Sequence, residues 1–119
     1  MDCKFPKNER LHSKKLIKEL FDKGSSFFLY PFKVFYLKPM GMETNQVLIS
    51  VTKKKVKKAV NRNYVKRRVK EAYRLNKQLA VPGDGKKKLI GLIYVSSDLM
   101  DFGQIQPIVQ KILIRLSKS

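Results

Sequence analysis

The sequence predicts an α+β protein in which helices pack on a single-layer sheet, in the order α-β-β-β-α-β-α. Apolar residues recur at helical spacing in three segments, and four other segments are short runs rich in β-branched and aromatic residues. The 119 residues contain no repeat and no linker-like tract. A chain of this length buries roughly two-thirds of the surface that it exposes when unfolded, which suffices for one core. We therefore expect one domain over residues 1–119.

The first helix is predicted between Ser13 and Lys23. Ser13 is a candidate N-cap, and Gly24 is a candidate terminator. The apolar side chains recur at steps of three and four, which makes the helix amphipathic: Leu16, Ile17, Leu20 and Phe21.

Three strands are expected next. Between residues 26 and 38 the strand formers are interrupted by Pro31, which predicts a short strand, a break and a longer strand. Residues 41–45 are predicted to form a turn, and residues 46–52 a further strand. We expect the two longer strands to pair as an antiparallel hairpin.

The second helix is the most informative segment, because residues 53–77 hold twelve Lys or Arg residues and one acid, Glu71. The helix is predicted to run to about Leu79. Indexing at about 100° per residue gives an apolar stripe: Val65, Val69, Ala72, Asn76 and Leu79. A neighbouring face is almost purely basic: Asn63, Lys66, Arg67, Lys70, Arg74 and Lys77.

This charge pattern indicates a polyanionic partner. Like charges along one helix face repel each other, so a face of one sign is unusual for an ordinary solvated surface. The whole chain has 27 Lys and Arg against 9 Asp and Glu, a net charge of +18 and a pI near 10.2. Such a field attracts polyanions, of which nucleic acid is the first candidate.

The chain is predicted to end in a strand and a helix. After a turn at residues 82–85, residues 89–95 form a continuous apolar run, typical of a central strand covered on both faces. Residues 98–103 are expected to form a loop. The closing helix is predicted from its apolar spacing, with Pro107 tolerated in its first turn: Ile105, Ile108, Val109, Ile112, Leu113 and Leu116.

Few side chains suit catalysis or metal binding. His12 is the sole histidine and Cys3 the sole cysteine, which excludes a two-histidine site and a cysteine cluster. Asp98 and Asp101 lie close in sequence, and we interpret them as turn or cap residues rather than metal ligands. No glycine-rich phosphate loop is present. We therefore predict no catalytic and no metal-binding residue in this chain.

A basic helix beside an aromatic sheet suits single-stranded or irregular RNA, because Lys and Arg bind phosphates and exposed rings stack on unpaired bases. The candidate rings are Phe21, Phe28, Phe32, Phe35 and Tyr36. Adjacent strand residues face opposite sides, so Phe35 and Tyr36 cannot both face the core. The sequence leaves open which face is exposed.

The stretch Ala59-Val-Asn-Arg-Asn-Tyr-Val-Lys-Arg-Arg-Val-Lys-Glu71, preceded by Ser50-Val-Thr-Lys-Lys, resembles the signature of the protein subunit of bacterial ribonuclease P. In that family Ser-Val-Ser-Lys-Lys leads into Ala-Val-x-Arg-Asn-Arg-x-Lys-Arg-x-x-Arg-Glu, and the resemblance spans almost the whole chain. Two departures are Tyr64, which replaces the second Arg of Arg-Asn-Arg, and residues 53–58, which lack the usual Gly and carry an extra Lys.

The resemblance implies a left-handed β-α-β crossover and a role in the endoribonuclease that removes the 5′ leader from precursor tRNA. It implies that the RNA subunit performs the hydrolysis and holds most of the Mg²⁺. The expected partners are that RNA and precursor tRNA, with no protein partner required. The implied contacts to the RNA subunit are Lys54, Lys55, Arg62, Asn63, Tyr64, Lys66, Arg67, Lys70 and Arg74. The implied contacts to the leader are Phe21 and Phe35.

Two other readings remain open. A ribosomal or RNA-chaperone protein would bind RNA without a role in cleavage. A basic helix on an anionic membrane is disfavoured because the apolar stripe is rich in Val and Ala and lacks bulky side chains. No apolar stretch is long enough to span a bilayer and no signal peptide is evident, so we expect a cytoplasmic protein without membrane association.

Overall fold

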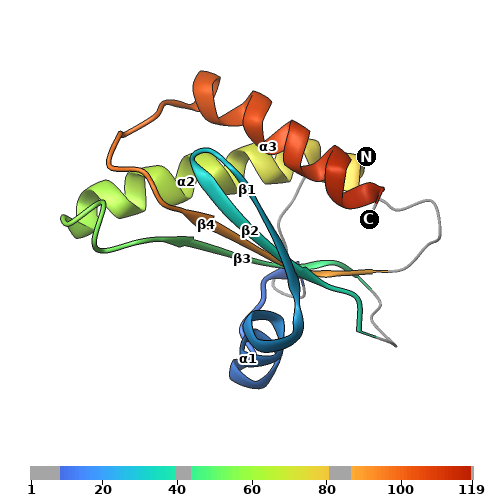
Figure 1. The fold of residues 1–119 in the computed structure, drawn as a ribbon. Helices are drawn as coiled ribbons and strands as arrows, with labels where there is room; N and C mark the ends of the chain where they lie inside the picture. The colour runs from blue at the N-terminus through green and yellow to red at the C-terminus, as the bar shows by residue number, and fades with distance from the viewer. Residues whose placement is uncertain (1–8, 40–43, 81–86, 119) are drawn as a thin grey trace.

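The computed structural model describes residues 9–39, 44–80 and 87–118. Its elements follow the predicted α+β order (Figure 1): α1 (Lys14–Lys23), β1 (Ser25–Leu29), β2 (Phe32–Leu37), β3 (Gln46–Val51), α2 (Ala59–Asn76), η2 (Lys77–Ala80), β4 (Leu89–Tyr94) and α3 (Phe102–Ser117). The turn at residues 82–85, most of the turn at residues 41–45, and Cys3 lie outside the described residues.

The four strands form one sheet in the order β1-β2-β4-β3. β1 pairs with β2 and β2 with β4, both antiparallel, whereas β3 and β4 are parallel. The predicted hairpin between the two longer strands is therefore wrong. β4 lies between them because its run of apolar residues is buried on both faces and fits only a central position. The antiparallel hairpin is instead β1–β2, which turns at Tyr30 and Pro31.

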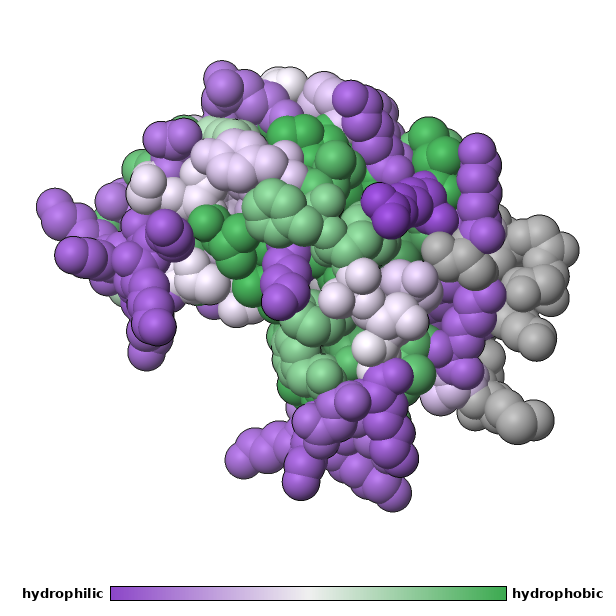
Figure 2. Space-filling model, in the orientation of Figure 1, coloured by the Kyte–Doolittle hydropathy of each residue, from purple (hydrophilic) through white to green (hydrophobic). Residues whose placement is uncertain are grey.

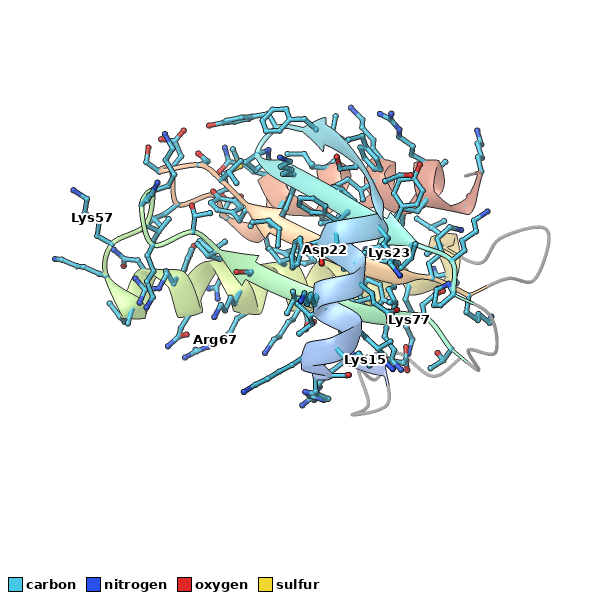
Figure 3. The ribbon with its side chains drawn as sticks, turned by 60° about the horizontal axis from the view of Figure 1, so that its bottom comes forward. Lys15, Asp22, Lys23, Lys57, Arg67 and Lys77 are labelled. Atoms are coloured by element: carbon cyan, nitrogen blue, oxygen red, sulfur yellow. The ribbon has the colours of Figure 1, made fainter. Side chains whose placement is uncertain are left out.

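The parallel pair requires a crossover, and α2 supplies it. The chain leaves β3, returns through α2 on one face of the sheet and enters β4 beside β3. This crossover is left-handed (Figures 1 and 3), opposite to the usual hand of such connections. It places the start of α2 at the end of the sheet where β3 stops.

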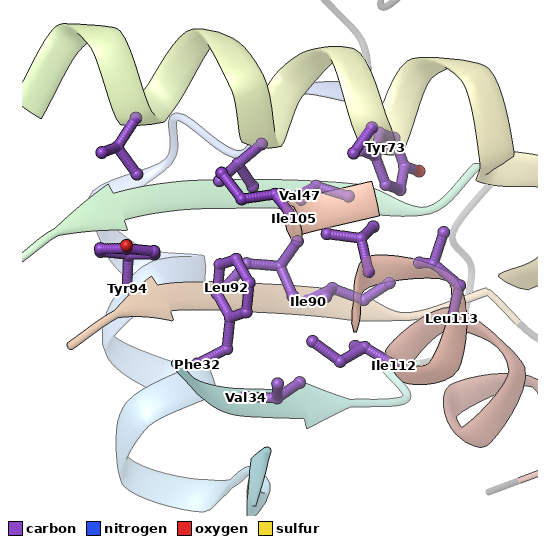
Figure 4. Close-up of a cluster of buried hydrophobic side chains, with 14 of the residues drawn as sticks. Phe32, Val34, Val47, Tyr73, Ile90, Leu92, Tyr94, Ile105, Ile112 and Leu113 are labelled. Atoms are coloured by element: carbon purple, nitrogen blue, oxygen red, sulfur yellow. The ribbon is translucent and has the colours of Figure 1, made fainter. Parts of the chain in front are cut away.

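The main core lies between the sheet and the helices α2 and α3 (Figure 4). Alternate residues of each strand point into it, including Val34, Leu92 and Tyr94, all fully buried. From α2 come the predicted residues Val65, Val69, Ala72 and Asn76, whereas Leu79 lies beyond the end of α2, in η2, and is partly buried. Tyr73, which the predicted stripe omits, is also buried there. Burial raises the pKa of the Tyr73 hydroxyl far above its usual value.

Asn76 is the polar member of this stripe, and its amide is satisfied inside the core. Its Nδ2 donates to the carbonyl oxygen of Ala72 at 2.8 Å, and its Oδ1 accepts from Nε2 of Gln110 at 2.9 Å. Because a buried amide without partners costs free energy, these bonds explain why Asn is tolerated and tie α2 to α3.

α1 is a short helix that packs on the opposite face of the sheet. Ser13 caps it, its Oγ accepting from the backbone N–H of Leu16 at 3.3 Å. Leu20 is fully buried against the sheet, where a side chain at Gly91 would approach its Cδ2 to 3.3 Å. Gly24 ends the helix as predicted. The position requires glycine, because a Cβ there would lie 2.3 Å from the carbonyl oxygen of Leu20.

α3 begins earlier than predicted. Asp101 is its N-cap, accepting from the backbone N–H of Gln104 at 2.9 Å, so residues 102 and 103 belong to the helix and not to the loop. The cap role assigned to Asp101 is confirmed. Pro107 lies in the second turn of the helix rather than the first, which corrects the expectation.

Candidate nucleic-acid interface

The solvent face of α2 carries the predicted basic side chains. Asn63, Arg67 and Lys70 are exposed, and Lys66 is half-buried. Figure 3 shows Arg67 projecting from the side of α2 that faces away from the core. Steps of three and four keep these groups on one surface, so the helix brings together most of the residues that the sequence assigned to RNA.

Two predicted basic residues are paired with acids. Arg74 donates to Glu71 through Nε at 3.1 Å and through Nη2 at 2.5 Å, and these hydrogen bonds lower the pKa of Glu71. Lys77 lies 3.2 Å from an oxygen of Glu9. The positive field of the helix therefore increases toward its N-terminal half.

The loop between β3 and α2 extends that field. Lys53, Lys54 and Lys55 are exposed, as are Lys57 and Lys58, while Val56 is buried and anchors the loop to the core. Figure 2 shows hydrophilic side chains gathered at the left end of the molecule, where this loop lies, and over α1 below. We call residues 53–58 the lysine loop.

Arg62 holds the lysine loop in place. Its Nη1 donates to the carbonyl oxygens of Val56 at 3.0 Å and of Lys57 at 2.7 Å. The sequence assigned Arg62 to the RNA, but the structure turns one edge of its guanidinium toward the protein backbone. Arg62 thus shapes the basic surface as well as contributing charge to it.

The lysine loop leads into a helix end that lacks a side-chain cap. Within the described residues, the N-cap Lys58 makes no capping hydrogen bond, and the first turn of α2 contains no acid. The partial positive charge of a helix N-terminus normally favours an anion. Five lysines therefore surround an end of the helix that is already positive.

Arg68 is a residue that the sequence analysis missed. Its guanidinium carbon lies 3.9 Å above the ring of Tyr64, and both side chains are half-buried on the flank of α2 nearest α3. A small hollow of about 320 Å³ lies beside them, lined by Arg67, Arg68, Glu71 and Phe102. The i, i+4 spacing of a tyrosine and an arginine was the signal that could have found the pair.

The second predicted site lies on the sheet face that carries α1. Phe21 of α1 and Phe35 of β2 meet edge to face, with ring centroids 4.7 Å apart. The Lys33 ammonium lies 5.3 Å from the centroid of the Phe35 ring. Phe21 is 40% exposed, so the two predicted leader residues come together at an accessible place.

The remaining candidate rings lie on different faces of the sheet. Phe32 is fully buried and Tyr36 packs against the main core, so neither ring is available for stacking. Phe28 is exposed. The exposed aromatic face is therefore the one that bears Phe35, which answers the question that the sequence left open.

Within the described ranges, no three His, Cys, Asp or Glu side chains come together as metal ligands. In the same ranges, no helix combines the length and apolar composition needed to cross a bilayer.

The fold places this chain in the class of ribonuclease P proteins of known structure. The ribonuclease P protein from Thermotoga maritima superposes with a TM-score of 0.74 at 29% identity, covering 90% of this chain and 96% of that one. The ribonuclease P protein from Staphylococcus aureus gives a TM-score of 0.71 at 26% identity, with 91% of each chain covered.

Sequence comparison identifies the family itself. The family model for ribonuclease P matches residues 5–117. The ribonuclease P protein component of Porphyromonas gingivalis is 39% identical over 118 residues, which are 93% of this chain and 85% of that protein. That of Citrifermentans bemidjiense is 35% identical over 115 residues, covering 96% and 93%. The chain belongs to the ribonuclease P protein family.

Proposed function

We propose that this chain is the protein subunit of a ribonucleoprotein endoribonuclease and assists removal of the 5′ leader from precursor tRNA. The observation that carries the proposal is the outward basic face of α2, on the family's signature helix, continued by the lysine loop. This surface binds the phosphates of the RNA subunit. The RNA contacts are Lys54, Lys55, Asn63, Lys66, Arg67 and Lys70, with Arg62, Tyr64 and Arg74 acting partly through neighbouring protein groups.

The leader binds on the sheet face beside α1. An unpaired base stacks on the rings of Phe21 and Phe35, and the neighbouring Lys33 ammonium contacts the phosphate next to that base. Because leader and RNA subunit use different surfaces of one small protein, the protein can hold the substrate against the RNA.

Hydrolysis is assigned to the RNA subunit. Mg²⁺ supplies charge stabilisation and an activated water in phosphodiester cleavage. The described residues bring no set of carboxylates together as its ligands, so the residues present do not fit a protein-held metal site. The protein contributes affinity for substrate and neutralisation of RNA phosphates.

The RNA-subunit surface is tested by salt-dependent binding. Lys66→Ala, Arg67→Ala and Lys70→Ala are each expected to flatten the slope of log affinity against log salt by about 0.7 to 0.9, the effect of one lost phosphate contact. Lys111→Ala removes one exposed lysine from α3, outside the proposed surface, and is the matched control. Equal slopes for Lys111→Ala and the α2 variants would contradict a localised surface.

The leader surface is tested by comparing substrate with product. Phe35→Ala is expected to weaken binding of precursor tRNA to the holoenzyme about fivefold, the low end for one base stacked on one ring. Binding of mature tRNA and of the RNA subunit should not change. An equal loss for mature tRNA would place Phe35 outside the leader site.

A further inference from the structure

α1 covers only part of the aromatic sheet face. The strand register aligns Phe35, Gly91 and Leu48 in one row across the sheet, and Leu20 of α1 packs on this row. The next row toward the tip of the β1–β2 hairpin consists of Phe28, Lys33, Ile93 and Ser50. Figure 3 shows α1 crossing the sheet and leaving its end near the lysine loop uncovered.

The end of this open row carries an exposed aromatic pair. Phe28 is 58% exposed and Tyr30 is 52% exposed, and their ring centroids lie 6.5 Å apart. The hydroxyl of Tyr30 lies 2.7 Å from Oγ of Ser96 and donates to Oδ2 of Asp98 at 3.3 Å. The Tyr30 ring is therefore fixed to the neighbouring loop while its face stays accessible.

Lys33 joins this pair to the aromatic pair under α1. It stands directly across from Phe28 in the β1–β2 register, and its ammonium also lies 5.3 Å from the Phe35 centroid. One cation thus lies between two accessible ring surfaces, Phe35 with Phe21 on one side and Phe28 with Tyr30 on the other. Successive rows on one face of a strand are about 6.6 Å apart, since they are two residues apart and each residue advances about 3.3 Å.

Rings alternating with a cation suit single-stranded nucleic acid, in which bases stack on rings and phosphates contact the cations between them. The occupant must be anionic, because the lysine loop borders the same end of the sheet and the chain carries a net charge of +18. A neutral apolar peptide would gain nothing from that field.

We propose that Phe28, with Tyr30 and Lys33, forms a second base-stacking site that binds an unpaired nucleotide of the leader beyond the nucleotide held at Phe21 and Phe35. The inference rests on the proposed function. It assigns the β1–β2 hairpin tip to the substrate and gives the protein a longer leader track than the α1 site alone provides.

The test is a leader-length series with the reconstituted holoenzyme. Precursor tRNAs with leaders that lengthen one nucleotide at a time are titrated against the parent protein, Phe28→Ala and Phe35→Ala. Phe28→Ala is expected to match the parent on short leaders and to bind about fivefold more weakly once the leader reaches the hairpin tip. Phe35→Ala should already lose affinity on shorter leaders. Phe28→Tyr keeps an aromatic ring and should restore the affinity that Phe28→Ala loses on long leaders.

Ile114→Ala is the matched control, because Ile114 is an exposed apolar residue, 42% accessible, on α3. It should follow the parent at every leader length. Phe28→Ala behaving like the parent on long leaders would overturn the proposal, and so would an equal loss on mature tRNA, which would indicate another partner or a structural role. If a leader of any length left the affinity of the parent holoenzyme unchanged, the proposed function itself would be contradicted.

Discussion

Arg62 shows how one side chain can serve both the fold and the partner. Its two hydrogen bonds to the lysine loop are directed and charge-assisted. The motif assigned this arginine to RNA because sequence shows which residues recur together and does not show where a guanidinium points. The structure therefore adds a positioning role that the residue pattern could not reveal.

We predict that Arg62→Lys, although it keeps the charge, loosens the lysine loop. Both hydrogen bonds come from Nη1, whose two N–H groups are held in the guanidinium plane, and a lysine ammonium lacks this fixed donor geometry. The free energy of unfolding should fall by about 1.5 kcal/mol, the low end for hydrogen bonds to a charged group, because Arg62 is half-buried. Hydrogen exchange at residues 53–58 and RNA affinity measure the effect. Unchanged hydrogen exchange together with unchanged RNA affinity would show that Arg62 acts only through its charge.

Tyr64 and Arg68 form the second residue-scale feature. Tyr64 occupies the position of a motif arginine, and the structure places another guanidinium over its ring, one turn later. Arg68 thereby restores a positive group near the position where the motif arginine is lost.

A double-mutant cycle measures this compensation. Arg68→Ala is expected to flatten the salt slope of RNA binding by about 0.7 to 0.9. In a Tyr64→Arg background the same change should have little effect, because the restored arginine provides the contact. Additive losses would show that Arg68 and position 64 act independently.

At the scale of elements, the start of α2 lacks the side-chain cap that would stabilise it in the free protein. α1 and α3 both have a side-chain cap, from Ser13 and Asp101, whereas α2 begins at Lys58 without one. The uncapped N–H groups and surrounding lysines are unfavourable in the free protein and favourable beside phosphate.

Lys58→Ser is therefore expected to stabilise the free protein by about 1 kcal/mol, because serine supplies the missing cap. The same variant should bind the RNA subunit more weakly, since one lysine is lost. Ser13→Ala is the companion variant and should destabilise by about the same amount without affecting RNA binding. Denaturant unfolding and RNA titration give both quantities. A less stable Lys58→Ser protein would contradict the account of this helix end.

The elements also show where sequence reasoning succeeds and where it stops. The apolar stripe of α2 and the break at Pro31 follow from local spacing, and both are confirmed. Strand pairing depends on which strand needs two covered faces, so the insertion of β4 between β2 and β3 was missed. The exposed basic face of α2 follows from periodicity, whereas the Arg62 contacts and the exposure of Phe28 follow only from the three-dimensional structure.

At the scale of the whole molecule, the two surfaces that we propose for RNA and leader share one sheet. The left-handed crossover places the start of α2 and the lysine loop at one end of the sheet, and α1 leaves the aromatic face open beside them. The net charge is +18, so the positive side chains repel one another in the free protein and together attract polyanions over a distance.

Salt should therefore act in opposite directions on folding and on binding. Raising NaCl from low concentration is expected to increase the melting temperature of the free protein, because screening weakens the repulsion among its lysines. The same change should weaken RNA binding through the loss of counterion release. Thermal unfolding and RNA titration over one salt series measure both. A melting temperature that falls with salt would indicate that attractive ion pairs dominate the fold.

The most direct test of the central claim is cleavage of a precursor tRNA at low magnesium by the protein alone, by a bacterial ribonuclease P RNA alone, and by the two together. The account predicts correct 5′ cleavage only in the mixture, since the RNA carries the chemistry and the protein supplies charge and leader contacts. Tight RNA binding without restored cleavage would contradict it and favour a ribosomal or RNA-chaperone role. Cleavage by the protein alone would contradict the assignment of hydrolysis to the RNA.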